Sequence, residues 1–284
     1  MTLNRRNLLV LGAAAAVTTS LGTTSLVARR ATAQKAATVA RAGAAIHYER
    51  HGTGTPVLLL HGGLGHSGWF DGLRDHLSAQ GWQVILIDTR GMGRSSLGNT
   101  ELSYAVQEED TYAVLDALGI EACPVIGFSD GGIAAYRMAS RPNSRITRLV
   151  TIGSRWSAEN GRGMWETFDT WNRDFLLSGD FRFIVEDYDR LNPDGDFDRM
   201  IGQAIAMWKD GGPDGHPESG IENISIPVLV TVGDGDPFLS VADADDARSR
   251  ITNASLLVAP GATHPIYQER PDVFLPALDA FLAG

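Results

Sequence analysis

Along residues 44–284, short apolar runs alternate with stretches that have the periodicity of an amphipathic helix. The alternating segment at 44–52 predicts an early, half-buried strand. Continuous apolar runs that lead into glycine-containing turns are typical of buried parallel strands, and they occur at 56–63, 82–93, 123–132, 146–153, 226–238 and 254–264. Helical spacing occurs between and after them, at 69–81, 104–120, 133–142 and 272–284. This alternation predicts an α/β fold with a mostly parallel central sheet flanked by helices.

Residues 155–222 interrupt the alternation and contain no convincing buried strand. They have an acidic excess, and a cluster of ten aromatic residues lies within 156–208. We expect a mostly helical lid over the carboxyl edge of the sheet, inserted between core segments 34–154 and 223–284. Most of the aromatic side chains are expected to pack the lid's own core and a few to line a pocket: Trp156, Trp165, Phe168, Trp171, Phe175, Phe181, Phe183, Tyr188, Phe197 and Trp208.

A serine stands between glycines where the apolar run at 123–128 meets a helical pattern. The stretch reads Gly127, Phe128, Ser129, Asp130, Gly131, which is a G-x-S-x-G pattern between a strand and a helix. In that setting a tight turn exposes the serine hydroxyl at the end of the sheet, and side chains at the two glycine positions would clash. The sequence therefore predicts that Ser129 is a nucleophile.

A serine nucleophile needs a base and an acid that orients the base, and both follow in the chain. His264 comes directly after the last predicted strand, and Asp234 and Asp236 come after the strand before it. We favour Asp236, because it precedes Pro237 and lies farther from the strand end, with more reach toward an imidazole. Asp234 is expected to brace the loop.

Backbone N–H groups near Ser129 could stabilise a developing oxyanion. Asp130 follows the serine at the start of a helix, and Gly63 lies in the glycine-rich loop after the run at 56–60, with Leu64 as the next candidate. The sequence contains neither an H-E-x-x-H pattern nor a cysteine pair, and the turn at 90–96 lacks the pattern of a phosphate loop. We therefore expect neither a metal nor a nucleotide cofactor.

The composition is that of a globular protein with an acidic balance. The chain has 34 Asp and Glu against 24 Lys and Arg, which argues against nucleic acid as a partner. Its one cysteine, Cys123, lies in an apolar run, so no intrachain disulfide can form and a core position is expected.

The first 33 residues differ from the rest. Arg5 and Arg6 precede an uncharged stretch at 8–28, and small residues at 31–33 follow a second arginine pair. This layout predicts a cleaved export signal that resembles the twin-arginine type, which implies a periplasmic or extracellular protein without stable membrane association after cleavage. A membrane anchor at 8–28 is the alternative.

The motifs HGGLGHSGWF, IDTRGMGRSS, GFSDGG, VGDGDPF and GATHPIYQERPDVF together resemble the α/β-hydrolase family across 38–284. The resemblance implies an α/β-hydrolase fold. The stretch GFSDGGIAA is similar to a carboxylesterase-like branch that includes valacyclovir hydrolase and biphenyl-hydrolase-like relatives. In that branch the acidic residue after the nucleophile is associated with recognition of a substrate amino group, and Asp130 matches it. Leu64 stands where proline iminopeptidases have a proline, which puts that activity in doubt.

The expected function is hydrolysis of a carboxylic ester, thioester or lactone of a small, partly apolar molecule. Ser129 would attack, His264 would act as base, and Asp236 would orient His264. The acidic lid could also favour cationic substrates. Three alternatives stay open: C–C bond hydrolysis or perhydrolysis by the same residues, a hydrolase-fold binding protein with slow turnover, and a membrane-anchored form of the enzyme.

Overall fold

The computed structural model describes residues 35–284. The predicted export signal at 1–33, with its alternative as a membrane anchor, lies outside the described residues. Among helices within 35–284, none has both the length and the apolar character required to cross a membrane.

Eight strands form one sheet in the spatial order β1-β2-β4-β3-β5-β6-β7-β8. The first two strands pair antiparallel, β2 also pairs antiparallel with β4, and the pairs from β4 to β8 are all parallel. The predicted mostly parallel sheet is therefore confirmed. The strands are β1 (Lys35–Arg41), β2 (Ala44–His51), β3 (Pro56–Leu60), β4 (Gln83–Ile87), β5 (Cys123–Phe128), β6 (Ile146–Ile152), β7 (Val228–Gly233) and β8 (Ala254–Ala259).

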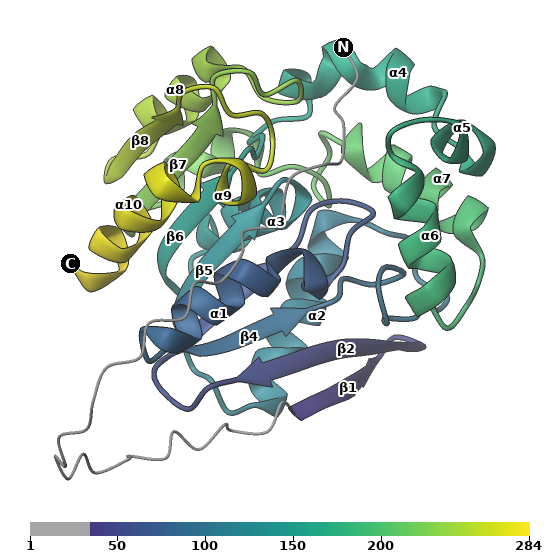
Figure 1. Cartoon of the computed structure of the whole chain (residues 1–284), viewed down its shortest axis with the longest axis horizontal. Coiled ribbons are helices and arrows are strands. Elements are labelled where there is room, and N and C mark those ends of the chain that lie inside the picture. The colour runs from purple at the N-terminus through teal and green to yellow at the C-terminus, as the bar shows by residue number, and fades with distance from the viewer. Residues whose placement is uncertain (1–34) are drawn as a thin grey trace, which may run out of the picture. The chain divides into compact units, whose positions relative to one another are not determined.

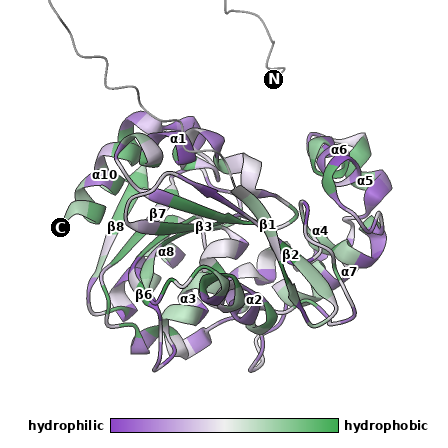
Figure 2. Ribbon diagram, turned by 90° about the horizontal axis from the view of Figure 1, so that it is seen from below, coloured by the Kyte–Doolittle hydropathy of each residue, from purple (hydrophilic) through white to green (hydrophobic). Residues whose placement is uncertain are grey.

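Helices cover both faces of the sheet, as Figure 1 shows. One face packs against η1 (Ser67–Phe70), α1 (Asp71–Ala79), α9 (Ile266–Glu269) and α10 (Pro271–Ala283). The other face packs against α2 (Tyr104–Ala117), α3 (Asp130–Ala139) and α8 (Val241–Arg250). The parallel strands are hydrophobic along most of their length because both faces of this part of the sheet are covered (Figure 2). Cys123 lies buried in this core, and burial raises the pKa of its thiol to about 12.

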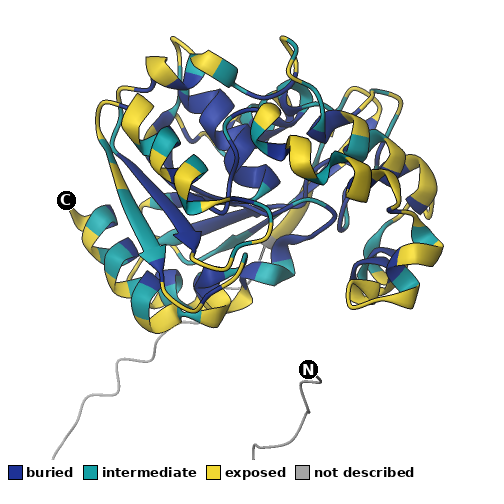
Figure 3. Cartoon of the chain, turned by 90° about the horizontal axis from the view of Figure 1, so that it is seen from above, coloured by how far each residue is buried: buried dark blue, intermediate teal, exposed yellow. Residues whose placement is uncertain are grey.

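The segment predicted as a lid is helical. It contains η2 (Glu159–Met164), α4 (Trp165–Asp169), α5 (Arg173–Ser178), α6 (Arg182–Leu191), α7 (Phe197–Trp208) and η3 (Glu218–Asn223). Its apolar side chains pack with residues from the loops after β3 and β4, including Leu64 and Met92. His66 in the β3 loop also contacts α6, with its Nε2 3.1 Å from Oδ2 of Asp187. The outer surfaces of these helices are largely exposed (Figure 3).

Several elements differ from the sequence prediction. The helices α8 and α9 were not predicted. The strand β1 was not predicted, and it extends the sheet at an antiparallel edge. The helix expected over 69–81 begins instead as the 3-10 turn η1, and α1 ends at Ala79 before Gly81, whose φ is +91°. None of these differences moves the strand ends at which the candidate residues lie.

Candidate active site

Ser129 lies at the sharp turn between β5 and α3. Its φ of 51° and ψ of −117° place a non-glycine residue in a backbone region that L-residues rarely adopt. Two backbone hydrogen bonds fix the turn, because Ser129 N donates to Ile152 O at 2.8 Å and Gly132 N donates to Ser129 O at 2.9 Å. Strain of this kind costs roughly 1–3 kcal/mol and persists only where surrounding structure enforces it. The turn thus holds the serine at the N-terminus of α3.

The flanking glycines are sterically required. A Cβ on Gly127 would lie 2.5 Å from the Cα of Gly132, and a Cβ on Gly131 would lie 2.1 Å from the carbonyl oxygen of Leu60. Both contacts are to backbone atoms, which cannot rotate away. The clash expected from the sequence at both positions is therefore present in the structure.

His264 and Asp236 meet at the ends of β8 and β7. The His264 Nδ1 lies 2.8 Å from the Asp236 Oδ2, and the Asp236 side chain is fully buried. The other oxygen, Oδ1, accepts hydrogen bonds from the backbone N–H groups of Phe238 and Leu239, at 2.8 and 3.2 Å. Because a carboxylate only accepts hydrogen bonds, His264 donates from Nδ1, which leaves Nε2 as the proton acceptor.

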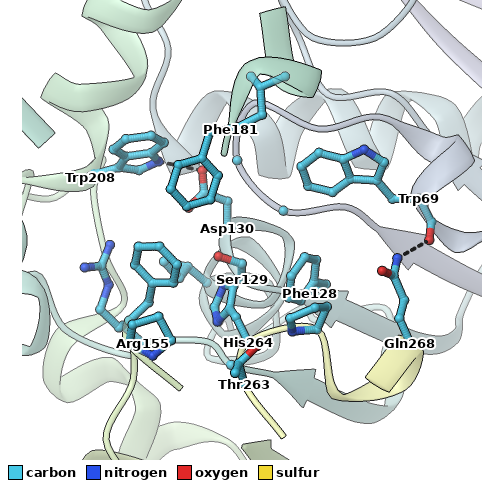
Figure 4. A pocket seen from close by; sticks show the side chains of 18 of the residues that line it. Trp69, Phe128, Ser129, Asp130, Arg155, Phe181, Trp208, Thr263, His264 and Gln268 are labelled. Atoms are coloured by element: carbon cyan, nitrogen blue, oxygen red, sulfur yellow. Dashed lines mark hydrogen bonds between the residues drawn. The ribbon is translucent and has the colours of Figure 1, made fainter. Parts of the chain in front are cut away.

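Asp236, and not Asp234, contacts the imidazole. Asp234 accepts a hydrogen bond from the backbone N–H of Gly261 at 2.8 Å, so it braces the loop after β8. Ser129 and His264 line the same pocket, and Figure 4 shows the two side chains beside each other.

The structure distinguishes among the three candidate oxyanion donors. Gly63 and Asp130 line the pocket, whereas Leu64 packs among the apolar residues of the insertion with a φ of +60°. A Cβ on Gly63 would lie 2.4 Å from the Asp130 Oδ2, so the loop after β3 approaches the start of α3 closely. Gly63 and Asp130 are thus the candidate donors that face the cavity.

The Asp130 carboxylate is buried and hydrogen-bonded by two aromatic residues. Trp208 Nε1 donates to its Oδ2 at 2.6 Å, and the Tyr104 hydroxyl donates to its Oδ1 at 3.2 Å. Burial raises the pKa of Asp130, while the Trp208 hydrogen bond and the charge of Arg155 oppose that rise. The carboxylate to which the family resemblance assigns amine recognition therefore already accepts two hydrogen bonds from protein side chains.

The pocket is a cavity of about 550 Å³ with mostly apolar walls that are rich in aromatic residues. Core residues such as Trp69, Phe128 and Phe238 form part of the wall. Half of the ten aromatic residues that cluster in the insertion also line the pocket, which is more than the few that were expected: Phe168, Trp171, Phe181, Phe183 and Trp208. Three of these five, Phe168, Trp171 and Trp208, pack the insertion's core as well.

Two residues after β6 belong to the site and were not singled out from the sequence. Gly153 has a φ of +58°, and a Cβ there would lie 2.7 Å from the His264 Nδ1. Arg155 is buried and lines the pocket. Their position at the carboxyl end of a parallel strand was the available signal, because ligands bind at that edge in α/β sheets.

His61 lies beside the site and is buried. Its Nε2 accepts a hydrogen bond from the backbone N–H of Thr89 at 2.9 Å, so it ties the loop after β3 to the loop after β4. Within residues 35–284, no group of three or more His, Cys, Asp and Glu side chains is placed to hold a metal ion.

The fold and the pocket define a hydrolase-fold enzyme that acts on small molecules. The family model described as "alpha/beta hydrolase fold" matches residues 55–183. The chain is 26% identical to a "Putative carbamate hydrolase RutD" from a Caulobacter species, over 84% of this chain and 96% of that protein. It is 27% identical to a "Non-heme haloperoxidase" from Rhodococcus erythropolis, over 78% of this chain and 90% of that protein.

An esterase from Exiguobacterium antarcticum has the same fold, with a TM-score of 0.72 and 19% identity over 85% of this chain and 97% of that one. Taken together, these likenesses show the α/β-hydrolase fold and support a place in that family. The branch suggested by the stretch at 127–135 stays a prediction.

Proposed function

We propose that this protein is a serine hydrolase that cleaves a carboxylic ester, thioester or lactone of a small, partly apolar molecule. One observation carries the proposal: Ser129, held in a strained turn, shares a pocket with His264, whose Nδ1 lies 2.8 Å from Asp236. The aromatic wall suits an apolar portion of the substrate. The likeness to an esterase fold is consistent with this class of chemistry.

In the proposed reaction, His264 Nε2 removes the proton from the Ser129 hydroxyl as its oxygen attacks the carbonyl carbon. The backbone N–H groups of Gly63 and Asp130 stabilise the negative oxygen of the tetrahedral intermediate. Collapse of this intermediate expels the alcohol, which takes the proton from His264. Water then attacks the acyl-enzyme by the same route. Throughout, Asp236 orients His264 and stabilises its charged form.

The first test is hydrolysis of p-nitrophenyl esters from acetate to decanoate. We expect the wild type to turn over, and Ser129→Ala to lower kcat by roughly 10³-fold or more. His264→Ala should show a similar loss, with circular dichroism as the control for folding. The proposal fails if the wild type hydrolyses no ester, or if Ser129→Ala retains the wild-type rate.

Perhydrolysis is a second candidate, favoured by the similarity to a haloperoxidase. In that reaction hydrogen peroxide replaces water, so a carboxylic acid and peroxide give a peracid and water. Product analysis with acetate and hydrogen peroxide separates the two activities. Peracid formation without ester hydrolysis would favour this candidate. A stoichiometric burst without turnover would instead favour a binding protein, and cleavage of a C–C bond in a β-diketone substrate would favour the C–C hydrolase alternative.

We also propose that the enzyme is exported, on the basis of the sequence at 1–33. N-terminal sequencing of protein from the periplasm or medium tests this. Gln34 as the first residue supports a cleaved signal. An intact N-terminus in the membrane fraction would support the anchor instead.

A further inference from the structure

Arg155 is a buried cation whose charge is not neutralised by a direct partner. The residue is only 6% exposed, yet it lines the pocket that contains Ser129. Its Nη1 is fully buried without a hydrogen-bond partner, and no residue within 35–284 forms an ion pair with the guanidinium. Figure 4 shows Arg155 on the wall opposite Trp69, with Ser129 between them in this view.

The residues around the guanidinium pack against it but do not give its buried Nη1 a hydrogen-bond partner. A Cβ on Gly161 would lie 2.1 Å from the Arg155 Nη1, so the backbone there packs directly against the charged group. On another side, the Phe168 ring centroid lies 5.7 Å from the Arg155 Cζ. Such a contact stabilises a cation weakly compared with a carboxylate partner.

The titratable groups that surround Arg155 do not cancel its charge by contact. Asp130 acts on it only through space and accepts its hydrogen bonds from Trp208 and Tyr104. His216 is neutral near pH 7, because burial lowers its pKa to about 4. An unpaired buried charge is costly, and functional sites are where such costs are retained.

We propose that Arg155 binds a carboxylate on the substrate, so that the natural substrate is an ester or lactone of an acidic compound. This inference rests on the proposed hydrolase function and narrows its substrate class. A guanidinium offers two parallel N–H groups that match a carboxylate. A single arginine near Asp130 suits one negative charge better than a phosphate dianion. The observations thus favour an anionic substrate over the cationic one that the acidic lid could favour.

The test compares esters of matched length that differ in charge. Monomethyl adipate is anionic, methyl hexanoate is neutral, and the methyl ester of 6-(trimethylammonio)hexanoic acid is cationic; hydrolysis of each is followed by titration of released acid. Monomethyl succinate and suberate vary the distance from the ester to the carboxylate. In the wild type we expect kcat/KM to be highest for an anionic ester.

In Arg155→Leu, the ratio of kcat/KM for the anionic over the neutral ester should fall by roughly 10- to 100-fold, mainly through KM. Arg155→Lys should restore part of the ratio, since it keeps the charge and loses the paired geometry. Arg182→Gln is the matched control, because it removes an exposed arginine of the insertion that pairs with Glu186. That control should leave the ratio unchanged.

Three outcomes would overturn the proposal. Equal losses on anionic and neutral esters in Arg155→Leu would mean that Arg155 serves only to balance Asp130. Wild-type kcat/KM on both esters in Arg155→Leu would mean that Arg155 contacts no substrate charge. A wild-type preference for the cationic ester would assign recognition to Asp130.

Binding measurements separate this inference from the proposed function. In Ser129→Ala, calorimetry should detect monomethyl adipate more tightly bound than methyl hexanoate, and adding Arg155→Leu should remove the difference. If the wild type hydrolyses no ester, the calorimetric comparison in Ser129→Ala still tests whether Arg155 binds a carboxylate. Equal binding of the two compounds in Ser129→Ala would count against it.

Discussion

At the scale of single residues, the turn at Ser129 leaves no room for a side chain on Gly131. A Cβ there would lie 2.1 Å from the oxygen and 2.4 Å from the carbon of the Leu60 carbonyl. Because these are backbone atoms of a central strand, we expect Gly131→Ala to lower the free energy of unfolding by about 3 kcal/mol or more. Urea denaturation measures the change.

Gly72→Ala is the matched control for this prediction. Gly72 lies in the first turn of α1, is exposed, and has no atom within 4 Å of an added Cβ. Alanine there should stabilise the protein by up to about 1 kcal/mol, because it is the better helix former. Equal effects of the two substitutions would show that the turn relaxes around a Cβ.

The sequence points to some site residues and not to others for a physical reason. Ser129, Asp236 and His264 each lie within a few residues after an apolar run, so their place at the edge of a parallel sheet could be predicted. Arg155 also follows a strand, but its burial depends on Gly161 and Phe168 closing over it. Packing between segments of an insertion leaves no periodic pattern along the chain. The sequence therefore does not distinguish a buried arginine from an exposed one.

At the scale of elements, the insertion shapes the pocket mouth through exposed aromatic residues. Phe181 is 38% exposed and lines the pocket just before α6, whereas Phe175 in α5 is 43% exposed and lies outside it. We expect Phe181→Ala to lower kcat/KM for p-nitrophenyl octanoate by roughly 3- to 10-fold, because an apolar contact with the longer chain is lost. The acetate ester should be affected less.

Phe175→Ala serves as the control, since it removes a similarly exposed ring from a neighbouring helix. Its ratio of octanoate to acetate kcat/KM should match the wild type. If both variants change this ratio alike, the effect comes from the insertion as a whole and not from the pocket wall. Urea unfolding of both variants checks that neither loses its fold.

The elements that could be predicted from the sequence are those with a strong apolar pattern. Strands β3 and β5 are almost entirely buried, and their continuous apolar runs carried the prediction. Strand β1 has the sequence KAATVAR, with a single large apolar residue, and it is stabilised by backbone pairing with β2 at the edge of the sheet. Pairing of this kind depends on the partner strand, so the local pattern gave no indication of it.

At the scale of the whole molecule, stability depends on pH through groups that are buried in their neutral form. His216 is 2% exposed, packs edge-on against Tyr104 with ring centroids 4.9 Å apart, and has its Nδ1 3.0 Å from the Asp210 carbonyl oxygen. Burial lowers its pKa from 6.5 to about 4. Between these values the unfolded chain binds a proton that the folded chain does not. The stability contributed by His216 is therefore present above pH 6.5 and is lost as the pH falls toward 4.

Between pH 7 and pH 5, this single group should lower the free energy of unfolding by about 2 kcal/mol. The variant His216→Asn retains an N–H donor for the Asp210 carbonyl but does not titrate. From pH 7 to pH 5, its free energy of unfolding should therefore fall by about 2 kcal/mol less than that of the wild type. The comparison isolates His216 from other groups. The pKa of buried His61 is also lowered, that of Asp130 is raised, and that of Glu49 is lowered to about 2. These three groups contribute equally to the wild type and the variant. If the free energy of unfolding, measured with urea, changes with pH equally in both proteins, His216 is not held neutral by burial.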